Sequence, residues 1–219
     1  ENKPYYVCHE TIYQYIYKKR QGKDWYACLA RSKPKRGKRK GRKVGSGKYH
    51  IRPIHSRSIE IMTRQQIGHW EADTIAFSSH KYENITTLVE RKSRYLLMIK
   101  NKNRQSDNVM KGIKDILSQL PRFKRRTITF DQGSEFAHWH FLERQTKCTV
   151  YHCNPHSPWQ RGTNENTNGR IRRFLPRSTP IQSLSQADID WICKKMNSFP
   201  RKILGFHTPK EAIKLKSKI

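Results

Sequence analysis

The sequence is poor in acidic residues. It has 17 Asp and Glu against 46 Lys and Arg, which leaves a formal net charge of +29 over 219 residues. Solubility requires far less charge than this, and such an excess of positive charge is typical of proteins that bind polyanions. The composition therefore favours nucleic acid as the partner, with a basic protein of the membrane surface as the alternative.

Long hydrophobic runs are also lacking. The longest apolar stretch is residues 95–99, whereas a membrane-spanning helix requires about 20 apolar residues. The sequence does not open with the charged and then apolar segment of a secretory signal. We therefore expect no membrane association, and we expect a cytoplasmic protein associated with the nucleoid.

The cysteines do not form pairs with a recognisable spacing. There are five, an odd number, and none belongs to a Cys-x-x-Cys motif, so the sequence predicts neither a disulfide framework nor a zinc ribbon. We expect reduced thiols that are mostly buried. His138 with His140, and His152 with His156, lack Cys or acid partners at zinc spacing and favour a structural role.

One segment is extremely basic. Residues 31–48 contain ten Lys or Arg, four Gly and no acid, so this segment cannot bury enough apolar surface to fold by itself. We predict a linker that lies along DNA phosphates, with a solvated segment or a targeting tag as the alternatives. Its residues assigned to DNA binding are Lys35, Arg36, Lys38, Arg39 and Lys40.

The remaining pattern predicts an α/β protein. Three stretches rich in β-branched and aromatic residues predict an antiparallel meander with a tight turn at 91–94. They are residues 70–77, 84–91 and 95–101. Helical spacing of apolar residues then predicts a helix from about 106 to 120.

The second half of the chain alternates between strands and helices. Capping signals at Ser185 and Thr208 predict two helices near the end of the chain. Apolar spacing predicts a short helix at 9–17. The other predicted elements are a strand at 126–130, a helix at 134–146, a strand at 147–153 and a helix that carries Glu165.

Three acids occupy positions that suit chemistry. Asp73 lies in the middle of a strand, where a buried carboxylate is costly unless it is paired or metal-bound. Asp131 ends a strand, at the sheet edge where ligands bind in open α/β folds. Glu165 lies on the helix face of Asn168 and Arg172, away from the core. Taken alone, Asp73 is equally consistent with a member of an ion pair, Asp131 with a helix cap and Glu165 with a solvated side chain.

Together, three such carboxylates can converge on divalent ions of the magnesium type. Two of these ions about 4 Å apart stabilise the attacking and leaving oxygens of a phosphodiester displacement. Arg172 lies two turns, about 11 Å, from Glu165 on the same helix face, so we expect its partner to be external. We predict that it binds a DNA phosphate that flanks the scissile one.

The segments around these acids resemble a known family. GHWEADTI around Asp73, TFDQGSEFA around Asp131 and SPWQRGTNENTNGRIRRFLP around Glu165 are similar to the acid-acid-glutamate motifs of the insertion sequence 30 family of bacterial transposases. Thirty-three residues separate Asp131 from Glu165, a spacing characteristic of that family. The order of the predicted elements also resembles the ribonuclease H-like core of transposases and retroviral integrases.

The resemblance implies a domain organisation. We expect an α/β ribonuclease H-like core, a mixed five-stranded sheet flanked by helices, at residues 59–180, and a C-terminal helical extension at 181–219. Residues 1–30 are similar to the end of an N-terminal helix-turn-helix region, and residues 31–58 form the basic linker. Because the sequence begins with Glu and most of the helix-turn-helix is missing, we expect it to be N-terminally incomplete.

The resemblance also implies a function. It implies a DDE transposase that hydrolyses a phosphodiester at an element end, after which the freed 3′-hydroxyl attacks another strand. Asp73, Asp131 and Glu165 would be its catalytic acids and the ligands of two Mg²⁺ ions, with Mn²⁺ as a substitute. The expected partners are duplex DNA, as element ends and target, and further copies of the chain in a homo-oligomer on DNA. Arg161, Asn168 and Arg172 are assigned to DNA binding.

Other functions stay open from the sequence. An inactive transposase relic that only binds DNA would keep the positive charge, and a ribonuclease H-like nuclease or resolvase could use the same fold because fold does not determine function. A basic RNA-binding protein is a further alternative.

Removal of residues 31–48 should weaken binding to all duplex sequences alike, because contacts to phosphates carry no sequence information. We expect the slope of log K against log salt concentration to flatten by about 0.9 for each lost phosphate contact, with base preference unchanged. DNA titrations at several salt concentrations measure both quantities. A changed base preference with an unchanged slope would show that the segment contacts bases instead.

Overall fold

The computed structural model describes residues 7–18, 24–30, 32, 34, 51–79, 82–155 and 157–215. Residues 1–42 and residues 43–219 form two separate compact units. The division falls inside the predicted linker, and the four predicted segments of the chain stay a prediction. The five basic residues that we assigned to DNA binding, Lys35 to Lys40 without Gly37, lie outside the described residues.

The first unit contains α1, His9–Lys18, and the 3-10 helix η1, Trp25–Cys28. The helix predicted at 9–17 is therefore confirmed. The rings of Tyr13 and Tyr17, one turn apart on α1, are stacked with their centroids 6.4 Å apart. Stacking of this kind stabilises one face of a short helix.

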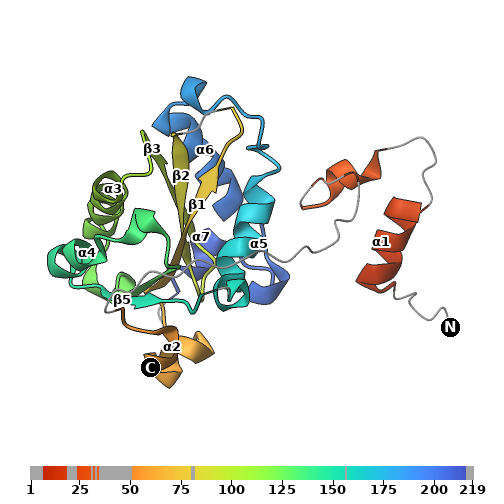
Figure 1. The fold of residues 1–219 in the computed structure, drawn as a ribbon. Coiled ribbons are helices and arrows are strands. Elements are labelled where there is room, and N and C mark those ends of the chain that lie inside the picture. The colour runs from red at the N-terminus through yellow and green to blue at the C-terminus, as the bar shows by residue number, and fades with distance from the viewer. Residues whose placement is uncertain are drawn as a thin grey trace. The chain divides into compact units, whose positions relative to one another are not determined.

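The larger unit is built on a mixed five-stranded sheet with the order β3-β2-β1-β4-β5 (Figure 1). Its first three strands form the predicted antiparallel meander, and β1, β4 and β5 are parallel to one another. The strands are β1 His69–Ala76, β2 Asn84–Glu90, β3 Leu96–Asn101, β4 Thr127–Phe130 and β5 Thr149–His152. The predicted sheet is confirmed.

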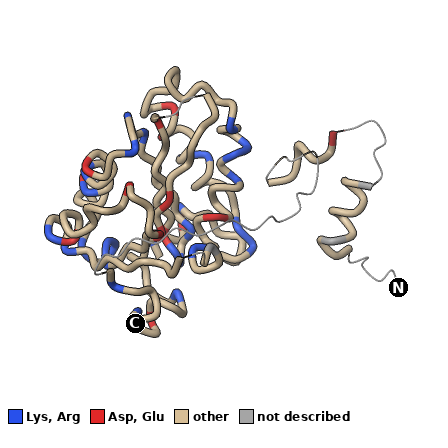
Figure 2. Tube along the Cα trace, viewed as in Figure 1, with Lys and Arg blue, Asp and Glu red and all other residues tan. Residues whose placement is uncertain are grey.

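Helices cover both faces of this sheet, with α3 and α4 on one side and α5 and α6 on the other (Figure 1). The α-helices are α2 Ile59–Thr63, α3 Ser106–Ser118, α4 Trp139–Thr146, α5 Gly162–Ile171, α6 Gln186–Asn197 and α7 Pro209–Ala212. The 3-10 helices are η2 Ile54–Ser56, η3 Arg122–Lys124, η4 Ser134–Phe136, η5 Pro158–Arg161, η6 Ile181–Ser183 and η7 Lys202–Leu204. Figure 2 shows Lys and Arg along the helices and loops around the sheet.

Strand alternation determines what faces each helical layer. Trp70 and Ala72 of β1 belong to the core under α3 and α4, whereas Ile75 belongs to the core under α5 and α6. Because successive side chains of a strand point to opposite faces, Glu71 and Asp73 share the face of Ile75. Both acids of β1 therefore lie on the α5 side of the sheet.

One predicted helix is interrupted. The segment predicted as a helix over 134–146 forms η4 and then α4, because His138 has φ −89° and ψ 31° and does not continue the helix. The backbone N–H of His138 donates to Ser106 Oγ at 2.8 Å, and its ring pairs with Asp107. These contacts with the start of α3 hold His138 at the interruption.

The predicted starts of the last two helices are confirmed. Ser185 and Asp188 form a reciprocal capping box at α6, and Thr208 and Glu211 form another at α7. In each box the side chains satisfy N–H groups that the first helical turn leaves without partners.

The cysteines are mostly buried, as expected. Cys148, Cys153 and Cys193 are buried, and Cys8 and Cys28 are exposed. A separate observation concerns membranes: among the described residues, the structure contains no helix long and apolar enough to span one.

Asn197 should be important for stability because it joins α6 to the edge of the sheet. Its side chain accepts from the Leu96 N–H and donates to the Leu96 carbonyl, both at 2.8 Å, and it is buried. Asn197→Ala leaves two buried backbone groups unpaired, so we expect a loss of about 2 kcal/mol or more in the free energy of unfolding. Denaturant unfolding measures it, and Lys194→Ala, an exposed change on the same helix, should stay within about 0.5 kcal/mol of the parent. Equal stability of the two variants would contradict this role.

Candidate active site

Asp73 is held on β1 by three polar contacts. Its Oδ1 accepts from the Thr74 N–H at 2.9 Å and lies 3.1 Å from Arg161 Nη1, and its Oδ2 accepts from Asn168 Nδ2 at 3.0 Å. Burial raises the pKa of Asp73 above its ordinary value, the charge of Arg161 opposes that rise, and the charge of Asp131 adds to it. The site therefore places a costly negative charge beside one strong cation.

Asp131 lies next to Asp73 because of the strand register. The parallel pairing of β1 and β4 matches Trp70 with Ile128 and Glu71 with Thr129, and two further residues along each chain bring Asp73 opposite Asp131. Oδ1 of Asp131 accepts from the Gly133 N–H at 3.0 Å. This hydrogen bond belongs to the turn that follows β4, so Asp131 lies just beyond the end of that strand.

A single guanidinium joins the two acids. Arg161 Nη1 lies 3.1 Å from Asp73 Oδ1, and Nη2 lies 2.9 Å from Asp131 Oδ2. Nη1 also donates to the Ala72 carbonyl at 3.2 Å, and the side chain is only 12% exposed. Burial alone would lower the pKa of Arg161, but the two carboxylates outweigh burial and raise it. The guanidinium is therefore firmly cationic and partly neutralises the acid pair.

Glu165 does not form a group of three acids with Asp73 and Asp131. It is exposed on α5, three residues before Asn168, whose amide reaches Asp73. The predicted orientation of α5 is confirmed, since Thr167 and Ile171 on the opposite face are buried. Within the described ranges, no group of three His, Cys, Asp or Glu side chains is placed to hold a metal ion. The structure therefore brings Asp73 and Asp131 together, whereas Glu165 lies on an exposed face of α5.

A buried polar network anchors α5 and was not foreseen from the sequence. The Thr87 hydroxyl lies 3.0 Å from Asn164 Oδ1 and 2.9 Å from Asn168 Oδ1. The Asn164 N–H donates at 3.1 Å to Glu71, which is fully buried and pairs with Arg91 at 3.0 Å. The available signal was the polar residues Glu71 and Thr87 at inward positions of β1 and β2, where an apolar residue is usual.

Glu135 is a further acid at this end of the sheet that sequence analysis missed. Its Oε1 accepts from the Thr74 hydroxyl at 2.7 Å. A Cβ atom at Gly133 would come within 2.7 Å of Glu135 Oε2 and 2.9 Å of Asp131 Oδ1. The absence of a side chain at Gly133 thus allows these two carboxylates to approach the turn. The interval of four residues between Asp131 and Glu135 was visible in the sequence.

A cavity opens beside Asp131. It has a volume of about 230 Å³ and is lined by Gln132, Phe136, Trp139 and His152, among others. Burial lowers the pKa of His152 to about 4, with the charge of Asp131 opposing that shift. The imidazole is therefore neutral at physiological pH, and Asp131 is the acidic residue of the lining.

Arg172 differs from expectation because it has partners within the chain. Its Nη2 donates to the Ala76 carbonyl at 2.7 Å and its Nη1 to the Leu175 carbonyl at 3.3 Å. Its guanidinium also lies over the Phe77 ring, 5.0 Å from the centroid. These contacts fasten the end of α5 to the end of β1. Contact of Arg172 with DNA stays a prediction, as does that of Asn168 and Arg161.

The five-stranded sheet with its flanking helices is that of an integrase-type core. Residues 63–158 match the family described as Integrase core domain. Within this class, the chain is 42% identical over 180 residues to "Transposase InsI for insertion sequence element IS30A" of Escherichia coli, an alignment that covers 81% of this chain and 46% of that protein.

Two further relatives match nearly the whole chain. The identity is 38% over 211 residues to "Transposase for insertion sequence element IS1086" of Cupriavidus metallidurans, and 33% over 210 residues to the IS4351 transposase of Bacteroides fragilis. These alignments cover 94% and 95% of this chain, and 62% and 64% of those proteins. Over most of its length the chain is similar to insertion-sequence transposases, that of IS30A among them, and it spans about half the length of the first of these relatives.

Arg161→Gln should make stability depend on pH through Asp73. The pKa of Asp73 is already raised, and loss of the opposing cation raises it further. The free energy of unfolding is therefore lowered at pH values where Asp73 is ionised. We expect the variant to be less stable than the parent at pH 7, with the difference shrinking as the pH falls through the raised pKa and a proton neutralises Asp73.

Denaturant unfolding between pH 7 and pH 5 measures this difference. Arg122→Gln, which removes an exposed charge from η3, is the control and should show no such trend. A stability loss that is the same at every pH would show that Arg161 contributes through packing rather than through charge.

Proposed function

We propose that this chain is a DDE transposase that cleaves insertion-sequence DNA and joins the freed 3′ end to another strand. The observation that carries the proposal is the convergence of Asp73 and Asp131 on one cation, on an integrase-type core similar to insertion-sequence transposases. Asp73, Asp131 and Glu165 are its proposed catalytic acids. Hydrolysis and strand joining are then the same displacement with two different nucleophiles.

The acid pair fits a divalent ion of the magnesium type. Such ions take oxygen ligands from a few carboxylates and keep the remaining positions for water and phosphate, and here two carboxylates already approach a single positive charge. Asp73 and Asp131 would hold the metal, with Glu165 as the third ligand, and Mn²⁺ could substitute. When bound, two such ions activate the attacking water and stabilise the leaving oxygen.

The protein's own groups would orient this site. Asn168 holds Oδ2 of Asp73, and the Gly133 N–H holds Oδ1 of Asp131, so each carboxylate presents a fixed geometry. Arg161 partly neutralises the pair. With a divalent ion held by Asp73 and Asp131, its guanidinium would be available for a DNA phosphate, the contact assigned to Arg161 from the sequence. Arginine suits this exchange because its planar fork matches the geometry of both carboxylate and phosphate.

Duplex DNA is the proposed partner, both as element end and as target. The net charge of +29 supports it, because backbone phosphates supply most of the affinity in such complexes. The remaining proposals are a homo-oligomer on DNA and a cytoplasmic location at the nucleoid.

A second candidate is an inactive family member that only binds DNA. One observation favours it: Glu165 is exposed and, among the described residues, does not complete a three-acid cluster. A ribonuclease H-like nuclease would differ in lacking the joining step. Assays of nicking and joining on duplex DNA with Mg²⁺ therefore distinguish the three candidates. A transposase nicks and joins, a nuclease only nicks, and an inactive family member does neither.

Asp73→Asn and Asp131→Asn should each abolish nicking while leaving DNA binding largely intact. An amide keeps the size of the carboxylate but removes an anionic ligand, whose contribution to transition-state stabilisation is several kcal/mol, so we expect the rate to fall by at least about a hundredfold. Nicking of supercoiled plasmid in Mg²⁺ or Mn²⁺ measures the rate, and gel shift measures binding.

Asp115→Asn is the matched control because Asp115 is a half-exposed acid of α3 paired with Lys114. It should nick at the parent rate. An Asp131→Asn protein with the parent rate would remove Asp131 from the active site, and a parent protein that binds but never nicks would identify the inactive family member.

A further inference from the structure

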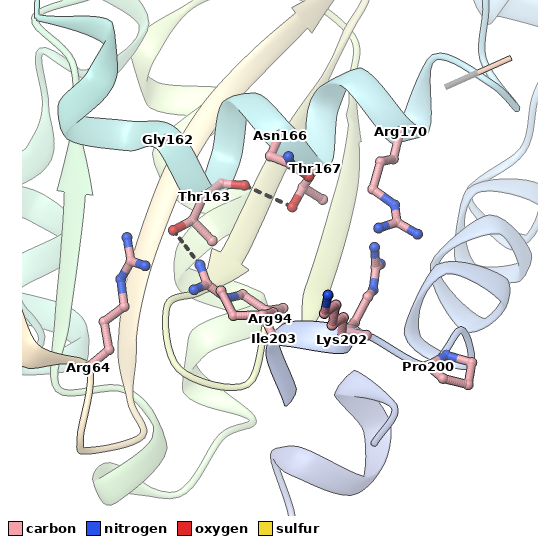
Figure 3. Close-up of a pocket in the computed structure, with 11 residues that line it drawn as sticks. Arg64, Arg94, Gly162, Thr163, Asn166, Thr167, Arg170, Pro200, Lys202 and Ile203 are labelled. Atoms are coloured by element: carbon pink, nitrogen blue, oxygen red, sulfur yellow. Dashed lines mark hydrogen bonds between the residues drawn. The ribbon is translucent and has the colours of Figure 1, made fainter. Parts of the chain in front are cut away.

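A second cavity lies on the other side of α5 from the acid pair. It has a volume of about 460 Å³, and five of its eleven lining residues are cationic, with none acidic (Figure 3). The cations are Arg64, Arg94, Arg170, Arg201 and Lys202. They come from the end of α2, the β2–β3 turn, α5 and the segment that follows α6. The tertiary fold therefore assembles one basic pocket from four separate segments.

The pocket is distinct from the candidate active site. Thr163 and Thr167 line it, and at 100° per residue both lie about 160° around α5 from Glu165. Asn168, which reaches Asp73, lies about 60° from Glu165 on that other face. The body of α5 thus separates the basic pocket from the acids.

Two arginines are fixed in the pocket wall. Arg94 Nη1 donates to Thr163 Oγ1 at 2.7 Å (Figure 3), and Arg201 Nη2 donates to the Met196 carbonyl at 3.1 Å. The Nε atoms of both side chains are buried and have no hydrogen-bond partner among the described groups. Buried donors of this kind are costly unless a ligand satisfies them.

The electrostatics contrast with those at the acid pair. Burial lowers the pKa of Arg201 to about 10, and the charges of Arg170 and Arg94 lower it further. At the acid pair, by comparison, two carboxylates raise the pKa of Arg161 in spite of its burial. Among the described residues that line the pocket there are five cations and no carboxylate, so positive charge is concentrated there.

We propose that this pocket binds a phosphate group of a DNA strand. Guanidinium forks match the oxygens of a phosphate, and the Thr163 and Asn166 side chains add neutral hydrogen-bonding groups. A cavity of about 460 Å³ accommodates a phosphodiester with its sugar, because ligand cavities of about 300–1,000 Å³ hold groups of this size. The pocket positions the backbone of the DNA that the proposed transposase acts on, so the inference rests on that function.

The test neutralises two pocket cations in the full chain. Arg64→Gln with Lys202→Gln removes two charges from the rim, and Arg122→Gln with Lys111→Gln removes two exposed charges from η3 and α3. Gel-shift titrations of duplex DNA are run at several salt concentrations. We expect the pocket variant to lose more affinity than the control, and its slope of log K against log salt to flatten by about 0.9 for each lost phosphate contact.

Stability is measured in parallel to exclude misfolding. Because the pocket cations repel one another, the variant without DNA should unfold at the same temperature as the parent or at a higher one. A lower unfolding temperature together with weaker DNA binding would indicate a structural role and would overturn the proposal. So would equal losses of DNA affinity in the pocket variant and the control.

Two further arms complete the test. One distinguishes a DNA phosphate from a free phosphate as the ligand, and the other distinguishes failure of the pocket proposal from failure of the transposase proposal. In the first arm, dAMP or inorganic phosphate is added and the unfolding temperature is measured. The assignment to a DNA strand is overturned if either ligand stabilises the parent but not the pocket variant, while the pocket variant and the control variant bind duplex DNA with equal affinity. At saturating DNA the control variant, Arg122→Gln with Lys111→Gln, should nick at the parent rate. A parent that does not nick, beside a pocket variant that loses affinity and slope, would overturn the transposase proposal and keep the phosphate pocket.

Discussion

The guanidinium of Arg161 between Asp73 and Asp131 is the contact on which the candidate active site depends. Two carboxylates on adjacent parallel strands repel each other, and burial makes the charge of Asp73 still more costly. One arginine at 3.1 and 2.9 Å from the pair opposes both effects in part. The proposed metal site uses the same two carboxylates that this ion pair joins.

The helix α5 organises the chemistry on both of its sides. On one side Asn168 reaches Asp73, and Glu165 shares that face. On the other side Thr163 and Thr167 line the basic cavity. The hydrogen bonds of Asn164 and Asn168 to Thr87 fix the rotation of the helix, so both faces are set by contacts with one strand. A change in the rotation of α5 about its own axis would therefore disturb both sites at once.

Much of this fold was predictable because its signals are local. Stretches rich in β-branched and aromatic residues located the strands of the meander, and capping residues located the starts of α6 and α7. The positions of Asp73 at mid-strand and Asp131 at a strand end pointed to the sheet edge. The break at His138 was not predictable, because it depends on hydrogen bonds with Ser106 and Asp107, about thirty positions away. Glu135 was passed over although it lies beside the pair of acids.

The sequence by itself determined the basic charge, the α/β order of elements and the acids that meet at the sheet edge, because periodicity and charge are properties of neighbouring residues. Only the tertiary structure decided what those acids and bases touch. Arg161 pairs with Asp73 across 88 sequence positions, and the basic cavity joins Arg64 to Arg201. Ion pairs and cavities of this kind form between segments that packing alone brings together, and no local pattern of residues specifies such pairings.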